Sequence, residues 1–475
     1  MKRVPNHRVA LPCRAFVALM LAVAPFPAFP ANYLIVLLDD VGVDKVGAYA
    51  EAPEPPPTPT LDALARQGVL FRNAWANPAC SPTRAAALTG RRAELTGLGK
   101  GIPPGPGLDT DELTIADVLG EAGYATAAIG KWHLEHDPEH PLNLGFDTHR
   151  GSRSNVGPGG YWNWRKFIDG VDQRRQSTYA TTDTANDAIA WIEAQTRPWF
   201  VWLSFNSPHL PLHAPPSRLH TRGDLVGATF PEVYAAMLEA VDTELARVLA
   251  AVDSDTTIIV MGDNGSYAQV IEPPFDSEHG KRSVYQGGVR VPLIVAGADV
   301  PAANRGAESG ALVQATDLFA TIAELVRSSA TADDSVSFAP QLADAAAPGR
   351  SMVYTSWFRP NGGPPDLNVY ARAARGARYK LIRTLGSRQE LYDLVADPHE
   401  SEDLLLRPLT PSAETALGRL SAFIDAHEWG RSTAERRAPD GRAAWVLIAA
   451  AAATIVLGVL LLRLRRRASP AVDDH

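Results

Sequence analysis

The chain has 475 residues, 45% of them hydrophobic and 21% charged, a composition typical of one large globular domain or two ordinary ones. Its net charge at pH 7 is -8 and no basic stripe crosses its body, which argues against nucleic acid as a partner. Only two cysteines occur, Cys13 and Cys80, and no cysteine and histidine cluster has the spacing of a zinc site.

The first segment, residues 1–31, has the pattern of a secretory signal peptide. Basic residues up to Arg14 precede the short apolar run AFVALMLAVAPFPAF. An uncleaved N-terminal anchor is the alternative, but prolines in the run shorten it below a membrane span. Once the signal is removed, Cys80 is the only cysteine of an exported protein.

Residues 32–340 alternate between apolar runs and helical patterns. The run NYLIVLLDD suits a strand buried on both faces, as in a parallel sheet. The alternation predicts an α/β doubly wound domain with a mostly parallel sheet flanked by helices. The predicted strands cover 32–40, 125–130, 198–205, 256–262 and 291–297, and the predicted helices cover 60–67, 81–89, 111–122, 183–196 and 231–252.

The pattern changes near residue 340. Strand-like alternation and a final helix near 411–427 predict a smaller α+β subdomain over 341–427, and the polar residues 428–442 form a linker. Residues 443–462 carry no charge and are long enough for a transmembrane helix. The tail 463–475 begins with RLRRR, which predicts a basic cytoplasmic tail and a body on the periplasmic or extracytoplasmic face. A cleaved sorting tail is the alternative.

Polar side chains follow four of the predicted strands where each strand ends. Ligands bind outside the carboxyl ends of parallel strands, so these side chains should gather at one edge of the sheet. Their oxygen atoms suit Ca²⁺ or Mg²⁺, and their histidines and lysines suit an anionic substrate. The residues are, in chain order, Asp39, Asp40, Lys131, His133, His209, Asp263 and Asn264, to which Lys281 is added.

Each of these residues also has an ordinary structural explanation. Two aspartates after a strand often form a turn or a helix cap, and the sequence GDNG is a common turn. Lys281 could be a solvated loop lysine. His213, four residues after His209, is an equal candidate for the functional histidine.

Cys80 lies in a different setting, at the predicted start of a helix. Pro82 suits the first turn of that helix and Gly90 suits its C-cap. Free N–H groups at a helix start favour negative charge, and Arg84 lies one turn on, on the same face. A small buried cysteine is the alternative.

Taken together, these residues resemble the formylglycine-dependent (type I) sulfatases, a branch of the alkaline phosphatase superfamily. CSPTR resembles the family's Cys-x-Pro-x-Arg motif, and the similar blocks run in the family's order over roughly 32–405. The other blocks are LLDDVG, TPTLDALARQGVLFRNAWA, GKWHL, SPHLPLHAP, GDNG, GKRSVYQGGVRVPLIV and YKLI…ELYDLVADPHE. The resemblance implies an alkaline-phosphatase-like fold.

The resemblance also implies a mechanism. A maturase oxidises Cys80 to Cα-formylglycine, which hydrates to a gem-diol. One hydroxyl attacks the sulfur of a sulfate ester, the alcohol leaves, and a covalent sulfate hemiester remains. The second hydroxyl then loses its proton, and sulfate is expelled as the aldehyde reforms. The implied metal, Ca²⁺ or else Mg²⁺, is held by residue 80 together with Asp39, Asp40, Asp263 and Asn264. Arg84 and Lys131 orient the formylglycine, His133 is the base, and His209 and Lys281 contact the sulfate and the bridging oxygen.

The implied substrate is a sulfated small molecule or glycan. A phosphonate or phosphate ester hydrolase with the same nucleophile is the alternative function, and a binding protein with a degenerate site is a third. Specificity is expected from the loops 97–110 and 150–180 and from the smaller subdomain. Ser152, Ser154 or Asn155 should supply a further polar contact, and the aromatic stretch 159–167 either stacks on a sugar or packs as a loop.

Overall fold

The computed structural model describes residues 32–102, 105–157 and 160–429. The predicted signal peptide 1–31, the transmembrane segment 443–462 and the tail 463–475 lie outside these residues, as does most of the predicted linker.

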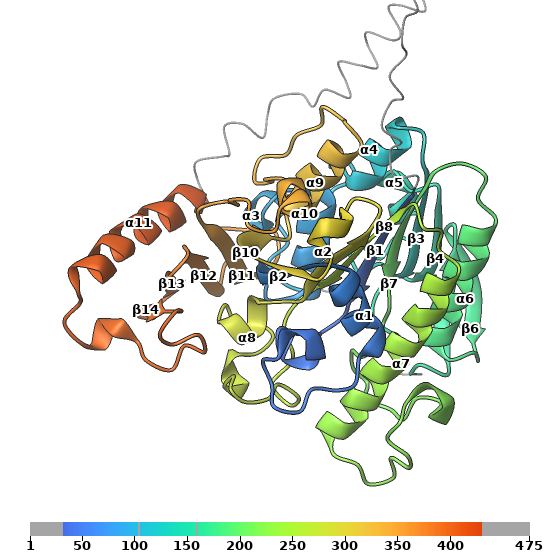
Figure 1. The fold of residues 1–475 in the computed structure, drawn as a ribbon, viewed down its shortest axis with the longest axis horizontal. Helices are drawn as coiled ribbons and strands as arrows, with labels where there is room; N and C mark the ends of the chain where they lie inside the picture. Colours follow the sequence, from blue (N-terminus) through green and yellow to red (C-terminus); the bar gives the residue numbers. More distant parts are fainter. Residues whose placement is uncertain (1–31, 103–104, 158–159, 430–475) are drawn as a thin grey trace, which may run out of the picture.

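A ten-stranded mixed sheet forms the centre of the molecule, in the order β10-β2-β9-β8-β1-β7-β3-β4-β5-β6 (Figure 1). Its strands are β1 (Asn32–Leu38), β2 (Gly68–Trp75), β3 (Ala125–Lys131), β4 (Thr148–Ser152), β5 (Trp164–Ile168), β6 (Val171–Gln176), β7 (Trp199–Ser204), β8 (Thr256–Gly262), β9 (Leu293–Gly297) and β10 (Ala307–Gln314).

The four central strands β8, β1, β7 and β3 are adjacent and parallel. Leu37 near the end of β1 pairs with Ser204 on one side and with Met261 on the other, so these strands end level with one another. The segments that follow them therefore leave the same edge of the sheet. By contrast, β9 runs antiparallel to both of its neighbours.

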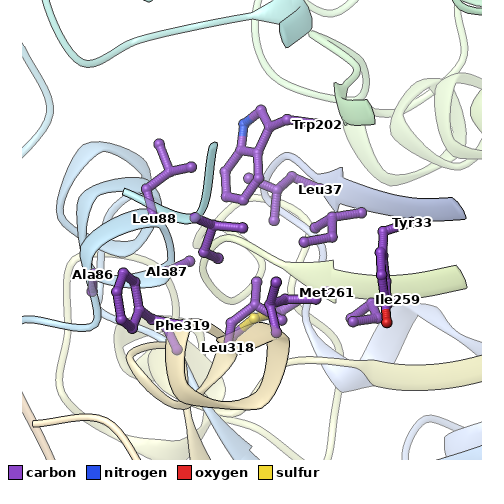
Figure 2. Close-up of a cluster of buried hydrophobic side chains, with 14 of the residues drawn as sticks. Tyr33, Leu37, Ala86, Ala87, Leu88, Trp202, Ile259, Met261, Leu318 and Phe319 are labelled. Atoms are coloured by element: carbon purple, nitrogen blue, oxygen red, sulfur yellow. The ribbon is translucent and has the colours of Figure 1, made fainter. Parts of the chain in front are cut away.

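Helices cover both faces of this sheet. On one face Tyr33, Ile35 and Leu37 pack with α2 (Cys80–Thr89), α4 (Ile115–Glu121), α9 (Asp317–Leu325) and α10 (Ala339–Ala343). Figure 2 shows Ala86, Leu88 and Phe319 in this cluster. On the other face Leu34, Val36 and Leu38 pack with α1 (Pro59–Gln67), α6 (Ala180–Glu193) and α7 (Phe230–Ala250). Successive side chains of β1 point to opposite faces of the sheet, and helices cover both faces. All of its side chains are therefore buried, which explains why the strand is apolar throughout.

A second, four-stranded antiparallel sheet lies beside the large one, in the order β11-β12-β13-β14 (Figure 1). Its strands are β11 (Val353–Arg359), β12 (Val369–Arg375), β13 (Tyr379–Thr384) and β14 (Gln389–Asp393), and α11 (Pro411–His427) covers one of its faces. The other face packs against Trp75, Val284 and Val289 of the large domain. The short helices α3 (Ala93–Thr96), α5 (His140–Asn143) and α8 (Gln286–Val289) lie in connecting segments.

The predicted fold class needs one correction. It included a transmembrane helix over 443–462, but no helix in the part of the chain that the structure describes is both long and apolar enough to cross a bilayer. The span itself lies outside the described residues. The fold class is therefore mixed α/β around one large sheet, and the described residues contain no helix that could cross a membrane.

Candidate active site

The acidic residues predicted at the strand ends come together in the fold. Asp39 and Asp40 directly follow β1, and Asp263 and Asn264 directly follow β8, its parallel neighbour. The Asp40 N–H donates to Asp263 Oδ1 at 3.1 Å, and Asn264 Nδ2 donates to Asp40 Oδ1 at 2.8 Å. Asp40 adopts a left-handed conformation with φ 63°, and the hydroxyl of Tyr234 donates to its carbonyl at 2.7 Å. The group is fully buried, so its charges need partners.

Two lysines and one arginine supply these partners. Lys131 Nζ pairs with Asp39 Oδ2, and Lys281 Nζ pairs with Asp40 Oδ1. Arg84, with no exposed surface, donates to Asp263 Oδ2 from Nη2 at 2.7 Å and from Nε at 3.1 Å. Its Nη1 also donates to the carbonyl of Lys131 at 3.0 Å. Arg84 thereby connects α2 to the ends of β3 and β8.

Burial and neighbouring charges shift the pKa values of the acids in opposite directions. Burial and the charge of Asp263 raise the pKa of Asp39 to about 7, against the effect of Lys131. Burial acts the same way on Asp40, but Lys281, His209 and Lys131 outweigh it and hold the pKa of Asp40 below its usual range. Of Asp39 and Asp40, Asp40 is therefore the carboxylate that is ionised at neutral pH.

Cys80 is the first residue of α2. The helix is capped at its other end by Gly90, which adopts a left-handed conformation with φ 69°. Its buried thiol faces His133, with Sγ 3.2 Å from Nδ1. Burial raises the pKa of the Cys80 thiol, although Lys131 and Lys281 oppose the effect. An unmodified thiol at this position therefore stays protonated and is a poor nucleophile.

His133 is held as a neutral base. Its Nε2 lies 2.7 Å from the carbonyl oxygen of Ile102, which can only accept, so Nε2 carries the proton. Burial and the positive charges of Lys131 and Arg84 keep the pKa of His133 well below its usual value. The free lone pair at Nδ1 therefore points at residue 80.

Of the two candidate histidines, only His209 reaches the acidic cluster. Its Nε2 lies 3.8 Å from Asp40 Oδ2, and its Nδ1 lies 2.9 Å from the carbonyl oxygen of Leu210. Burial lowers the pKa of His209 to about 3, although Asp40 opposes the effect. His213 instead stacks on Tyr161, with ring centroids 4.1 Å apart, and bonds the hydroxyl of Tyr179 at 3.0 Å. His213 therefore belongs to a packed aromatic cluster.

The acidic cluster fits a divalent cation. Asp39 Oδ1 and Asn264 Oδ1 are buried and have no hydrogen-bond partner among the described residues, which is costly unless a cation binds there. Asp39, Cys80 and Asp263 can each bring one ligand atom within 4.8 Å of the others, as can Asp39, Asp40 and His209. Carboxylate and amide oxygens are the ligands that Ca²⁺ and Mg²⁺ prefer.

Several contacts of the site involve residues to which the sequence assigned no role at the site. Ser81 Oγ donates to the carbonyl of His133 at 2.7 Å and accepts the N–H of Ile102 at 3.2 Å. The hydroxyl of Tyr161 lies 2.6 Å from the carbonyl oxygen of Asn206 and 2.7 Å from that of His209. Ser81 occupies a variable position of the Cys-x-Pro-x-Arg motif and Tyr161 lies in the aromatic stretch 159–167, and the sequence alone does not show that they contact backbone groups of the site.

Of the candidate polar residues in 150–157, Ser152 lies beside the site. Ser152 Oγ lies 3.1 Å from Asn206 Nδ2, which places it next to the loop that carries His209. Asn155 Oδ1 is buried without a hydrogen-bond partner among the described residues. Of the aromatic stretch, Tyr161 and Trp164 are packed inside, whereas Trp162 is 47% exposed.

Comparison with known protein families gives two matches. A family model described as Sulfatase matches residues 31–328, and a model described as N-sulphoglucosamine sulphohydrolase, C-terminal, matches residues 277–419. The two matches overlap over residues 277–328, a segment of the large domain that contains β9, β10 and α9.

Curated relatives and a solved structure agree with these matches. N-acetylgalactosamine-6-sulfatase of Canis lupus familiaris is 30% identical over 306 residues, and the match covers 56% of each chain. The chain thus spans about half the length of this relative. Steryl-sulfatase of Mus musculus is 26% identical, with 89% of this chain and 86% of that one covered. The crystal structure of Ps i-CgsB in complex with k-i-k-neocarrahexaose is similar at 25% identity with a TM-score of 0.73, covering 85% of this chain and 93% of that one.

Proposed function

Because the chain belongs to the sulfatase family, we propose that it is a sulfuric ester hydrolase that cleaves sulfate monoesters. One observation carries the proposal: Cys80 begins α2 with its Sγ 3.2 Å from the unprotonated Nδ1 of His133. Asp39 and Asp263 each offer a ligand atom within 4.8 Å of the same thiol. This is the arrangement that an activated nucleophile needs, with a base and a cation site at one atom.

We further propose that a maturase converts Cys80 to Cα-formylglycine, which supplies two hydroxyl groups at this position once it is hydrated. The atom Cys80 Sγ stands in the place of those hydroxyl oxygens. His133 Nδ1 is then positioned to accept a hydroxyl proton, while Ile102 holds the opposite ring nitrogen as a donor. Arg84 and Lys131 orient the cluster around residue 80 through Asp263 and Asp39.

Lys281 and His209 serve the sulfate and the leaving group in this proposal. Lys281 is a permanent cation, because Asp40 and the other acids raise its pKa despite burial. It therefore stabilises the negative charge of sulfate oxygens. The Nδ1–H of His209 donates to the carbonyl of Leu210, so Nε2 carries no proton while the ring is neutral. Nε2 becomes a proton donor when the negative charge of the bound sulfate ester favours the protonated form of the ring.

A divalent cation, with Ca²⁺ as the first choice and Mg²⁺ as the second, would be held by Asp39, Asp40, Asp263, Asn264 and residue 80. When bound, it polarises sulfate oxygens and stabilises the charge that develops on them. The unpartnered oxygens Asp39 Oδ1 and Asn264 Oδ1 support this assignment.

The alternative function, hydrolysis of phosphonate or phosphate esters, is not favoured, because the curated relatives described above are all named sulfatases. One relative is named for an N-acetylgalactosamine substrate and another for steryl substrates, so both a sulfated glycan and a sulfated small molecule belong to the proposal. We also propose that the protein is exported, because residues 1–31 have the pattern of a secretory signal peptide.

Two measurements test the proposed function. Protein made with its native maturation machinery should show an aldehyde in place of the Cys80 thiol in the mass of the peptide that contains residue 80. The same protein should turn over an aryl sulfate faster than the matched aryl phosphate and aryl phosphonate. A preference for either phosphorus ester would overturn the proposal.

Removal of divalent cations should abolish most of the activity, and Ca²⁺ or Mg²⁺ should restore it. Added Ca²⁺ should also raise the melting temperature, since a ligand at 100 times its Kd stabilises a protein by about 2.7 kcal/mol. Asn264→Ala should reduce this Ca²⁺-induced shift, whereas Asn186→Ala, an exposed amide on α6, should leave it unchanged. Full activity in a metal-stripped sample would rule out the metal role.

A further inference from the structure

Two cations at the rim of the site form no ion pair with any residue that the structure describes. Lys100 is half-buried, and among the described residues its ammonium group donates only to the carbonyl of Gly101, at 3.4 Å. Arg359 is exposed at the end of β11. In a chain of net charge -8, two neighbouring cations that have no acidic partner in the described part of the chain are available for an external anion.

Lys100 lies beside the reacting residues. A Cβ added to the next residue, Gly101, would lie 3.6 Å from His133 Cε1 and 4.0 Å from Cys80 Sγ. The residue after that, Ile102, accepts the hydrogen bond of His133 Nε2. The segment 99–102 therefore forms one wall of the site, and Lys100 belongs to that wall.

The second sheet holds Arg359 against the same wall. Asn361 Oδ1 accepts the N–H groups of Gly99 and Lys100, each at 3.0 Å. On the other side of Arg359 in the sequence, the N–H of Phe358 donates to the carbonyl of Gly99 at 3.4 Å. Burial, followed by the charge of Arg359, lowers the pKa of Lys100, which is the effect of two cations held close together. An anion between them would relieve this repulsion.

An aromatic ring completes the rim. Side chains alternate along β11, so Thr355, Trp357 and Arg359 share one face. Thr355 Oγ1 donates to the carbonyl of Ala76 at 3.1 Å, in the segment that leads to Cys80. The guanidinium of Arg359 lies over the ring of Trp357, 5.6 Å from its centroid. This face of β11 thus extends from the approach to residue 80 to the exposed Arg359.

We propose that Lys100 and Arg359 bind a second anionic group of the substrate, a sulfate or a carboxylate, while the scissile sulfate occupies the site at residue 80. The proposal rests on the proposed sulfatase function and names its substrate class as an acidic saccharide with at least two anionic groups. The planar fork of Arg359 matches two oxygens of either anion, and Lys100 adds a point charge. Trp357 packs against the core between the two sheets and lies under the Arg359 guanidinium, which helps to hold this fork at the rim.

The test compares four substrates of the matured enzyme: an aryl sulfate, a disaccharide with one sulfate, and the same disaccharide with either a second sulfate or a carboxylate. We expect kcat/KM to be about tenfold higher for at least one of the two doubly anionic disaccharides than for the singly sulfated one. Arg359→Gln and Lys100→Gln should each remove most of this preference, and Arg359→Gln should leave aryl sulfate turnover unchanged. Salt should weaken the preference in the parent enzyme. The doubly anionic disaccharide that is favoured identifies the second group.

Arg305→Gln is the matched control. Arg305 is exposed, forms no ion pair with a described residue and precedes β10, at the amino edge of the sheet and away from residue 80. The Arg305→Gln variant should cleave all four substrates with the kcat/KM of the parent enzyme. No preference for a second anion in the parent, or an equal loss on aryl sulfate and disaccharides in the rim variants, would overturn the subsite. Failure of the matured enzyme to cleave any sulfate ester would overturn the proposed function instead.

A binding measurement separates the two proposals further. In Cys80→Ala protein, which needs no maturation, the favoured doubly anionic disaccharide should bind about tenfold more weakly once Arg359→Gln is added. Equal affinity with and without Arg359→Gln would contradict the subsite whatever the activity of the enzyme.

Discussion

Replacing Cys80 by alanine should lower sulfate ester hydrolysis by about a thousandfold or more, because the residue that attacks sulfur is lost. The fold should persist. Cys80 is the first residue of α2, a position that alanine tolerates, and the side chain lost is small. The measurement is kcat/KM on an aryl sulfate together with a thermal melt, which should shift by only a few degrees.

Cys80→Ser is the control for size and polarity. A serine keeps one hydroxyl near His133 Nδ1, but its sulfate ester has no second hydroxyl to expel sulfate. We therefore expect no sustained turnover from this variant either. Near-parental turnover by Cys80→Ala would contradict the mechanism, and sustained turnover by Cys80→Ser would show that a plain hydroxyl is sufficient.

Replacing Arg84 by methionine should lower the free energy of unfolding by about 3 kcal/mol or more. Arg84 and Asp263 are both fully buried, and their pairing distance is 2.7 Å. Removing one partner of such a pair leaves the other charge buried and unpaired, which typically costs about 3 to 5 kcal/mol. Chemical denaturation of the metal-free protein measures the change.

Arg165→Gln is the matched control for Arg84. Arg165 also pairs with an aspartate, Asp172, but both lie at the surface. Screening by water makes such a pair contribute little, so this variant should unfold like the parent. Added Ca²⁺ should narrow the difference between Arg84→Met and the parent, since a cation takes over part of the charge of Asp263. Parental stability of metal-free Arg84→Met would contradict the role of Arg84.

The strands that carry the site were predictable because they are buried on both faces. The run 256–262 coincides with β8, and 32–40 contains β1 with the two aspartates that follow it. Strands at the margins were missed. The polar β6 and the short β5 were interpreted as part of a loop, since an exposed edge strand lacks the apolar pattern. The reversed direction of β9 was also not predictable, because an apolar run carries no information about its direction.

The choice between two histidines illustrates what the sequence left open. His209 and His213 lie four residues apart between prolines, and no local pattern separates them. Only packing places His213 against Tyr161 and leaves His209 near Asp40. The transmembrane prediction was corrected for a different reason: the described chain has no helix of the necessary length and apolarity.

The sequence by itself determined the chemical types that the site contains. Acids and an amide follow buried strands, a cysteine stands where a helix begins, and the family resemblance rests on these residues and is confirmed by the Sulfatase match over 31–328. Only the tertiary structure decided which ring nitrogen of His133 faces residue 80 and which cations have acidic partners. Those properties depend on contacts between segments far apart in the chain, such as Ile102 with His133, Arg84 with Asp263 and Asn361 with Lys100. A local pattern of residues cannot encode them, because each contact is set by the packing of the whole sheet.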